Sequence, residues 1–201
     1  MRSESDARRP TLHDETHMSD EQLLQAFLRG DGAMFHRLVR RHEVPLHAFI
    51  CRVSGAGTDA ADLFQETFLR VYQHAGTFRG RSSFKTWLYS IALNICRSYG
   101  RSAARRRPVS DLAGVDPPAD GPGPNGEAES TEIGRSIERA LGELPAAQRE
   151  VFVMKAYEQM TYGEIADVVG LPLGTLKSQM RLALKKLRTA LHSLAQAHGL
   201  A

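Results

Sequence analysis

The chain has 201 residues, of which 42% are apolar and 24% charged, and its formal net charge is +3. These values are ordinary for a soluble globular protein with one domain or two small ones. No stretch approaches the roughly 18 apolar residues of a membrane span, and residues 1–17 lack the apolar core of a signal peptide. We therefore expect a cytoplasmic protein without direct membrane insertion.

Cysteine and histidine give little sign of chemistry. Cys51 and Cys96 are too few for a disulfide framework, and each lies in an apolar helical pattern, so we expect two buried free thiols. The segment HDETH has the histidine spacing of a zinc peptidase helix, but Asp14 stands where that motif has its glutamate base. We expect no metal site, no cofactor, no small-molecule substrate and no catalytic residues, and hence no enzyme.

The basic residues lie in two long stretches that contain no acid. No Asp or Glu occurs between Glu66 and Asp111, and after Asp167 every side chain of fixed charge is basic. A solvated face normally mixes both signs, so each stretch predicts a surface that faces a polyanion. A merely solvated face is the alternative.

The first helix that the pattern predicts covers TDAADLFQETFLRVYQH, residues 58–74. Its inner stripe consists of Phe64, Phe68, Val71 and Tyr72. The outer face of this helix carries acids, amides and one leucine. This mixture suits contact with another protein, although a solvated face explains it as well. This outer face comprises Asp62, Gln65, Glu66, Leu69 and Gln73.

The next segment, GTFRGRSSFKTWLY, combines aromatic rings, cations and hydroxyls. If Ser83 caps a helix, a narrow apolar line forms that includes Trp87, so Trp87 is expected in the core rather than as a base-stacking ring. The opposite face is expected to meet DNA or a regulator, and it carries Lys85, Thr86, Tyr89, Leu93 and Arg97, with Asn94 at its margin. The loop of residues 76–83, with Phe78 and its cations, is a candidate for capturing a flipped base.

A proline-rich acidic segment follows. Residues 108–128 hold five of the nine prolines and no Lys or Arg, which predicts a flexible, disordered acidic linker that can extend over roughly 70 Å. We therefore expect an all-α protein of two small helical domains. The predicted boundaries are 1–18 for a disordered tail, 19–107 for the first domain, 108–128 for the linker, 129–195 for the second domain and 196–201 for a C-terminal tail.

The second domain ends in a short helix, a glycine turn and a long basic helix. Thr161 and Glu164 form a capping box, Gly170 and Pro172 end the short helix, and the next helix starts near Thr175. Its apolar stripe comprises Leu176, Met180, Ala183, Leu187, Leu191 and Leu194. This pattern predicts a helix-turn-helix whose second helix enters the major groove, with an ordinary helical hairpin as the alternative. The candidates for base or phosphate contacts are Thr175, Lys177, Ser178, Gln179 and Arg181, followed by Lys185 and Arg188 for phosphates.

The order of these motifs resembles the extracytoplasmic-function (ECF) sigma factors of bacterial RNA polymerase, in the sigma-70 family. The motifs are DLFQETFLRVY, TFRGRSSFKTWLYSIALN, the linker, and LGELPAAQREVFVMKAYEQMTYGEIADVVGLPLGTLKSQMRLALKKLR. The resemblance implies a region 2 helical bundle that binds core polymerase and opens the -10 element, and a region 4 helix-turn-helix that reads the -35 element. Core RNA polymerase, promoter DNA and an anti-sigma factor are the implied partners.

The resemblance also implies roles for particular residues. The outer face from Asp62 to Gln73 would meet the clamp helices of the polymerase. The -10 contacts would come from Phe78, Arg79, Arg81, Ser82, Ser83, Lys85, Tyr89, Asn94, Arg97 and Arg101. The -35 contacts would come from Thr175, Lys177, Ser178, Gln179, Arg181 and Lys185.

The sequence departs from the usual family pattern at five positions and leaves one alternative function. Family members often carry arginine where Ser90, Leu93, Gln179, Leu182 and Leu184 stand, so base assignments do not transfer at those positions. Fewer cations imply weaker phosphate contacts or a larger apolar surface for a regulator. A stand-alone helix-turn-helix regulator is the alternative, but its sensor domain would not need an acid-free stretch.

Overall fold

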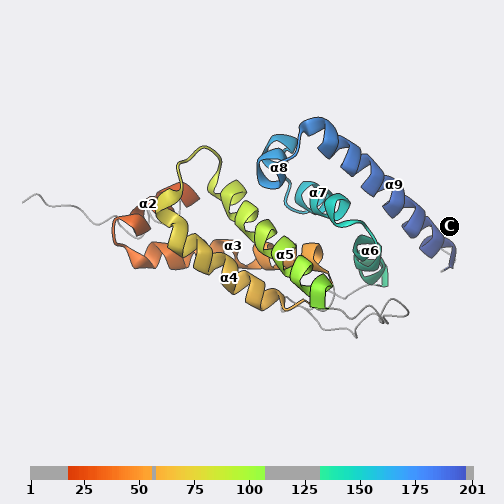
Figure 1. Cartoon of the computed structure of the whole chain (residues 1–201), viewed down its shortest axis with the longest axis horizontal. Coiled ribbons are helices and arrows are strands. Elements are labelled where there is room, and N and C mark those ends of the chain that lie inside the picture. The colour runs from red at the N-terminus through yellow and green to blue at the C-terminus, as the bar shows by residue number, and fades with distance from the viewer. Residues whose placement is uncertain (1–17, 56–57, 107–131, 198–201) are drawn as a thin grey trace, which may run out of the picture.

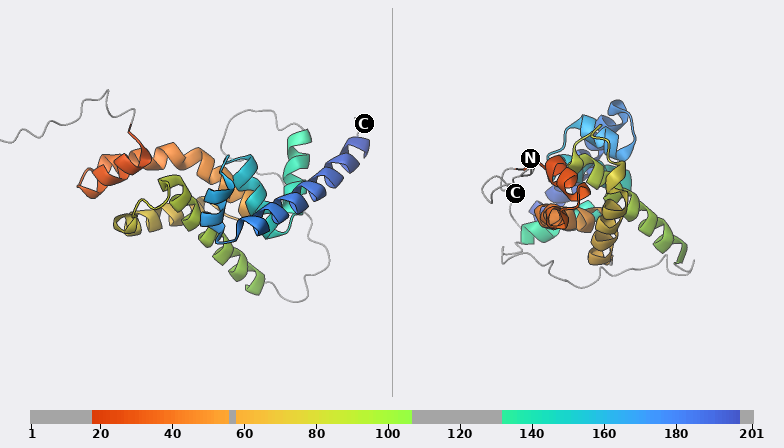
Figure 2. Two further views of the ribbon diagram at one scale, coloured as in Figure 1. Left: turned by 90° about the horizontal axis from the view of Figure 1, so that it is seen from above. Right: turned by 90° about the vertical axis from the view of Figure 1, so that its left-hand side faces the viewer.

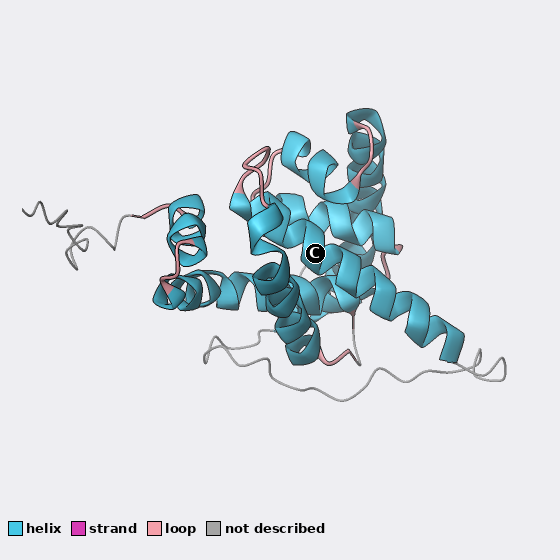
Figure 3. Ribbon diagram, turned by 60° about the vertical axis from the view of Figure 1, so that its left-hand side comes forward, coloured by secondary structure: helices cyan, strands magenta, loops and turns pink. Residues whose placement is uncertain are grey.

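The structure is a computed structural model that describes residues 18–55, 58–106 and 132–197. These residues form helices and connecting loops, with no strand among them (Figure 3). The all-α expectation is confirmed. The predicted linker, nearly all of the N-terminal tail and most of the C-terminal tail lie outside the described residues.

The first group of helices runs from Asp20 to Arg106. It contains α2 (Asp20–Leu28), α3 (Gly32–Ser54), α4 (Ala60–His74), the 3₁₀ turn η1 (Ala75–Thr77) and α5 (Phe84–Arg106). Side-chain caps fix where three of these helices begin, because they satisfy backbone N–H groups that have no partner inside the helix. Ser19 and Gln22 form a capping box on α2, Asp31 accepts a hydrogen bond from the Ala33 N–H, and Asp59 accepts from the first turn of α4.

The second group contains α6 (Glu132–Gly142), α7 (Ala146–Ala156), α8 (Tyr162–Val169) and α9 (Leu173–Ala197). Figure 1 shows α9 along the outer edge of the molecule, with α7 and α8 between it and α5. The predicted apolar stripe of α9 is confirmed at Leu176, Met180, Ala183 and Leu187, which are all buried.

The two groups pack against each other. One hydrophobic cluster contains Phe49 and Leu88 of the first group together with Met154 and Ile165 of the second. Helix α5 lies between α3 and α4 on one side and α8 on the other, and the end of α3 meets α7 (Figure 2). The sequence predicts two units joined only by a tether, so this shared core is a feature that it did not indicate.

Two burial predictions are wrong. Tyr72 was expected in the inner stripe of α4 but is 56% exposed, because Phe68 and Val71 fill the core positions of that turn. The Cys51 thiol is exposed while that of Cys96 is buried. On α3, Ile50 and Val53 take the inward positions, and Cys51 falls on the outside of the helix.

Candidate DNA and polymerase interfaces

The predicted polymerase-facing side of α4 is a surface in the structure. Asp62, Gln65, Leu69 and Gln73 are exposed, and Leu69 leaves 52% of its surface uncovered. Glu66 is half-buried and pairs with Arg70 one helical turn away, at 2.7 Å. The five residues therefore form one continuous face, on which the Glu66 carboxylate is held in place.

An aromatic cluster that the sequence did not indicate borders this face. The Tyr72 ring lies 5.3 Å from the ring of Phe27 on α2 and 5.3 Å from that of Phe35 on α3. Leu28 on α2 is 50% exposed as well. These residues come from three helices, so no periodicity within one segment could have grouped them. Together with Leu69 they extend the candidate polymerase surface beyond α4.

The loop of residues 76–83 stands at the N-terminal end of α5. Arg79, Arg81 and Ser83 are exposed and Ser82 is half-buried. Gly80 has φ +66°, a left-handed value that a side chain would disfavour. The Phe78 ring is half-buried and packs on Trp87, with 5.3 Å between ring centroids. Trp87 is itself partly buried and packs against the hydrophobic cluster, in agreement with the predicted inward position.

Two contacts anchor the start of α5. Ser83 caps the helix as predicted, because its hydroxyl accepts a hydrogen bond from the Thr86 N–H at 3.1 Å. The Glu21 carboxylate of α2 accepts from the Phe84 N–H at 2.8 Å, and this bond lowers the pKa of Glu21. The loop of residues 76–83 is therefore attached to a helix whose N-terminal end is held in place.

The face of α5 that was expected to meet DNA or a regulator is covered by the second group of helices. Thr86, Tyr89 and Leu93 are buried. The Tyr89 hydroxyl donates to the Glu158 carboxylate, and Lys85 Nζ donates to the Glu158 carbonyl oxygen at 2.7 Å. Of the candidate residues on α5, Asn94 and Arg101 are exposed.

Arg97 makes the tightest polar contact on that face. Its Nε and Nη2 atoms donate to the two carboxylate oxygens of Glu150 on α7, at 3.0 and 2.6 Å. These hydrogen bonds raise the pKa of Arg97, although burial alone would lower it. Sequence reasoning missed both Glu150 and Glu158, which are buried in the structure, where a carboxylate needs a partner.

The helix-turn-helix is built as the sequence predicts. Thr161 Oγ1 accepts from the Glu164 N–H, and the Glu164 carboxylate accepts from the Thr161 N–H, which lowers the pKa of Glu164. Gly170 ends α8 in the left-handed conformation at φ +75°. Leu173 then starts α9, two residues before the predicted position.

The -35 candidates lie on the outer side of α9. Thr175, Lys177, Ser178, Arg181 and Lys185 are exposed and Gln179 is half-buried. Leu182 and Leu184 are 42% and 52% exposed on the same helix. The structure therefore brings cations and leucines together on one accessible helix surface.

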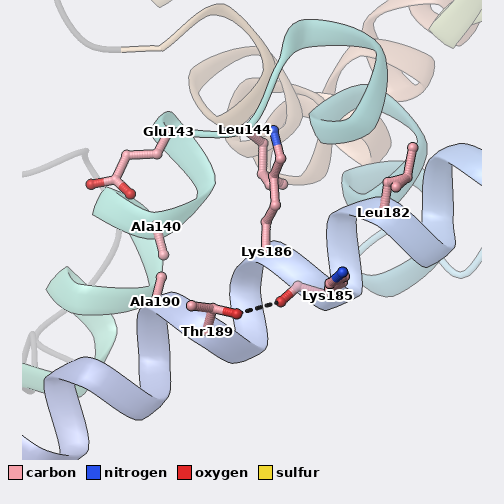
Figure 4. Close-up of a pocket in the computed structure, with 8 residues that line it drawn as sticks. All are labelled: Ala140, Glu143, Leu144, Leu182, Lys185, Lys186, Thr189 and Ala190. Carbon is pink, nitrogen blue, oxygen red and sulfur yellow. Dashed lines mark hydrogen bonds between the residues drawn. The ribbon is translucent and has the colours of Figure 1, made fainter.

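A groove of about 490 Å³ lies between α6 and α9 (Figure 4). Its lining consists of Ala140, Glu143, Leu144, Leu182, Lys185, Lys186, Thr189 and Ala190. The polar side chains among these are all exposed, so the groove has no buried polar group to orient a small molecule.

Within the described ranges, no three His, Cys, Asp or Glu side chains gather where they could hold a metal ion. The helices of those ranges are also too short or too polar to cross a membrane.

Comparison with known proteins gives the family. Sigma-70 region 2 matches residues 38–106, and Sigma-70, region 4 matches residues 134–187. The RNA polymerase sigma-H factor of Pseudomonas aeruginosa is 30% identical over 89% of this chain and 97% of its own length. The ECF RNA polymerase sigma-E factor of Escherichia coli K12 is 29% identical over 81% of this chain and 89% of its own length.

Solved structures agree with the sequence matches. The sigma factor RpoE of Bartonella quintana, in complex with the anti-sigma factor NepR, superposes with a TM-score of 0.67 and 26% identity over 79% of this chain and 96% of its own. CnrH in complex with the cytosolic domain of CnrY gives a TM-score of 0.65 and 28% identity over 87% and 97%. The fold and the helix-turn-helix thus define a transcription initiation factor of the sigma-70 class. Within that class the chain belongs to the ECF sigma factors, as the motif order predicts.

Proposed function

We propose that this chain is a dissociable promoter-specificity subunit of bacterial RNA polymerase. Region 2 (residues 19–107) docks on core polymerase through the outer face of α4 and captures the melted -10 strand with the 76–83 loop and α5. Region 4 (residues 129–195) reads the -35 element with α9. The protein performs no covalent chemistry, and it acts in the bacterial cytoplasm because the polymerase and the promoters are there.

The observation that carries this proposal is the exposed N-terminal half of α9. Thr175, Lys177, Ser178 and Arg181 lie within two turns at the end of the helix that a helix-turn-helix inserts into the major groove. Arg181 suits guanine or a phosphate, and Lys177 suits a phosphate. Gln179 is half-buried, so it reaches an adenine edge only with part of its side chain.

The 76–83 loop supports the second DNA contact. Its exposed arginines suit phosphates, and the half-buried Phe78 ring belongs to a cluster of three rings with Trp87 and Phe84. A base that leaves the duplex gains stacking on such a surface. The contacts of α5 itself require that region 4 first leaves its face.

An anti-sigma factor is the further partner that we propose. The solved structures of RpoE and CnrH, which resemble this chain, are complexes with the anti-sigma factor NepR and with the cytosolic domain of CnrY, respectively. The exposed Leu182, which lines the groove between α6 and α9, provides an apolar contact for such a partner.

Reconstituted transcription tests the proposal. The purified chain is mixed with core polymerase and a library of linear promoter fragments, and the transcripts are sequenced. The proposal predicts initiation from a defined subset of templates only when both components are present. Tight binding to a duplex operator without polymerase, with no stimulated transcription, would instead establish a stand-alone regulator.

The polymerase-docking face has its own test. Asp62→Arg combined with Glu66→Arg reverses the acidic side chains of the face and is expected to abolish co-purification with core polymerase. Circular dichroism should stay helical, because both residues lie on the outside of α4. Glu43→Arg, an exposed charge reversal on α3, is the control. Unaltered co-purification of the double variant would contradict the assignment of this face.

A further inference from the structure

Two buried carboxylates of region 4 occupy the face of α5 that the proposed function assigns to DNA. Glu150 is 4% exposed and Glu158 is 7% exposed. Glu150 pairs with Arg97, and Glu158 accepts from the Tyr89 hydroxyl while its carboxylate lies 3.7 Å from Lys85 Nζ. We call these two carboxylates and their three partners the closing contact.

The closing contact supplies what each buried carboxylate needs. A carboxylate removed from water is strongly disfavoured unless cations or hydrogen-bond donors pair with it. Among the described residues, the side chains that donate hydrogen bonds to the Glu150 and Glu158 carboxylates come from α5. The burial of these two acids against region 2 therefore depends on Lys85, Tyr89 and Arg97 of α5.

Of these three side chains, Arg97 and Tyr89 are the ones that cannot serve DNA at the same time. Arg97 holds Glu150 through two parallel hydrogen bonds, the geometry in which a guanidinium also binds a phosphate. The Tyr89 ring is fully buried, so it offers no surface to a base. Glu150 thus takes the place on α5 that a phosphate of the promoter strand would take.

The residue after Glu158 has an unusual backbone conformation. Gln159 has φ +56°, a left-handed value that is unfavourable for any residue except glycine. The turn is held by Lys155, whose Nζ donates to the Met160 carbonyl at 3.1 Å. This turn follows the end of α7, where the Met160 N–H donates to the Met154 carbonyl at 3.1 Å, and it holds the segment that carries Glu158.

The adjoining junction of α3 and α7 is poorly satisfied. Three buried polar atoms there make no hydrogen bond within the described residues, namely Arg52 Nε, Gln148 Oε1 and Arg149 Nε. Burial also lowers the pKa of Arg149. Buried polar atoms without partners destabilise an interface, because separation would return them to water. The closed arrangement therefore combines the shared hydrophobic cluster and a few ion pairs with a junction whose unpaired polar atoms oppose closure.

We infer that the closing contact is autoinhibitory: in the free protein, Glu150 and Glu158 act as mimics of the promoter backbone and block α5 until region 4 moves away. This inference rests on the proposed function of α5 as a -10 surface. It goes beyond that function, since it assigns a regulatory role to two acids that touch neither DNA nor polymerase.

The test compares the full-length protein with Glu150→Gln/Glu158→Gln, which keeps the side-chain shapes and removes both charges. The control is Glu138→Gln/Glu143→Gln, which removes the same charge from exposed positions of region 4. The radius of gyration is measured by small-angle X-ray scattering. Binding to a fluorescent, mixed-sequence single-stranded DNA of 20 nucleotides is measured in parallel at low salt.

The inference predicts a larger radius of gyration for Glu150→Gln/Glu158→Gln and a DNA affinity at least about tenfold higher, because the competent state is no longer a minor population. The control should match the wild type in both measurements. A variant that stays compact would overturn the inference, and so would one that opens without binding DNA more tightly than the control.

Failure of the proposed function gives a different result. In that case the wild type yields no template-specific transcription with core polymerase, whatever the scattering shows. If transcription is template-specific but Glu150→Gln/Glu158→Gln remains compact, the sigma function stands and the autoinhibitory contact is rejected.

Discussion

Two helices of this protein, α5 and α9, are basic and were expected to face DNA, but their cations differ in exposure and pairing. Helix α9 lies along the outer edge of the molecule (Figure 1), and its cations Lys177, Arg181 and Lys185 are exposed. On α5, Lys85 and Arg97 are paired with the backbone and the carboxylates of region 4. Similar residues are therefore available on one helix and occupied on the other.

The cause of the difference lies in the surroundings of each helix. Helix α9 buries one stripe against α6, α7 and α8, so its opposite side stays in water. Helix α5 is enclosed by α3, α4 and α8, and only part of its circumference remains exposed. A count of cations along a sequence indicates a polyanion-binding helix, but the acids that reach it from elsewhere decide when it is free.

Charge reversal on α9 should have the largest effect of those considered. Lys177→Glu with Arg181→Glu replaces two contacts to DNA with repulsion, and we expect template-specific transcription to fall about a hundredfold or more. Run-off transcription with core polymerase measures this. Lys186→Glu, one turn further along α9, is the control and should retain most activity. Full activity of the double variant would remove α9 from the -35 contact.

The next effect concerns the 76–83 loop, which remains accessible although α5 is covered. Phe78→Ala with Arg79→Ala removes a stacking ring and a cation, and promoter opening should fall about tenfold. Permanganate reactivity of thymines measures opening, and co-purification measures core binding, which should persist. Equal loss of both activities would show that the loop has no separate role in strand capture.

The free energy of unfolding should depend more on Arg97, which is paired with Glu150, than on the exposed Arg181. Arg97→Ala leaves Glu150 without its charged partner and should lower the free energy of unfolding by about 2 kcal/mol. The loss is limited because the two regions can separate and hydrate Glu150. Arg181→Ala on α9 should change it by less than about 0.5 kcal/mol. Urea unfolding followed by circular dichroism provides both values, and equal losses would contradict the contrast between the two helices.

The smallest effect involves Tyr89. Two effects raise the pKa of Tyr89 above its ordinary value. Burial is the larger, and the hydrogen bond to Glu158 is the second. The folded state therefore retains the proton longer than the unfolded state. Its contribution is complete below about pH 10 and is lost as the pH rises above that value. Tyr89→Phe should cost about 1 kcal/mol at neutral pH and flatten this alkaline loss. An alkaline stability profile identical to that of the wild type would contradict this assignment.

Local signals predicted the parts of the fold that depend on neighbouring residues. Thr161, Glu164 and Gly170 fixed the limits of α8 because capping involves residues three to six positions apart. The same holds for Ser83 at the start of α5 and for the buried stripe of α9. These features were correct in type, and the start of α9 was misplaced by two residues.

Features that depend on distant contacts were not predictable in this way. Tyr72 is exposed because Phe68 and Val71 fill the core beneath it, and Cys51 lies outside because Ile50 and Val53 face inward. The closing contact joins residues that are 53 and 69 positions apart, across the linker. The sequence does not indicate it, because Glu150 and Glu158 lie beside other polar residues on either side of the apolar run 151–154.

Competitive acetylation of lysines in the free protein tests the central contrast most directly. Mass spectrometry compares Lys85, whose Nζ donates to the Glu158 carbonyl, with the exposed Lys177 in the same sample. The account predicts that Lys85 reacts several-fold more slowly than Lys177, and that Glu150→Gln/Glu158→Gln brings the two rates together. Equal rates in the wild type would contradict it, because they would show that α5 is as accessible as α9 before any partner binds.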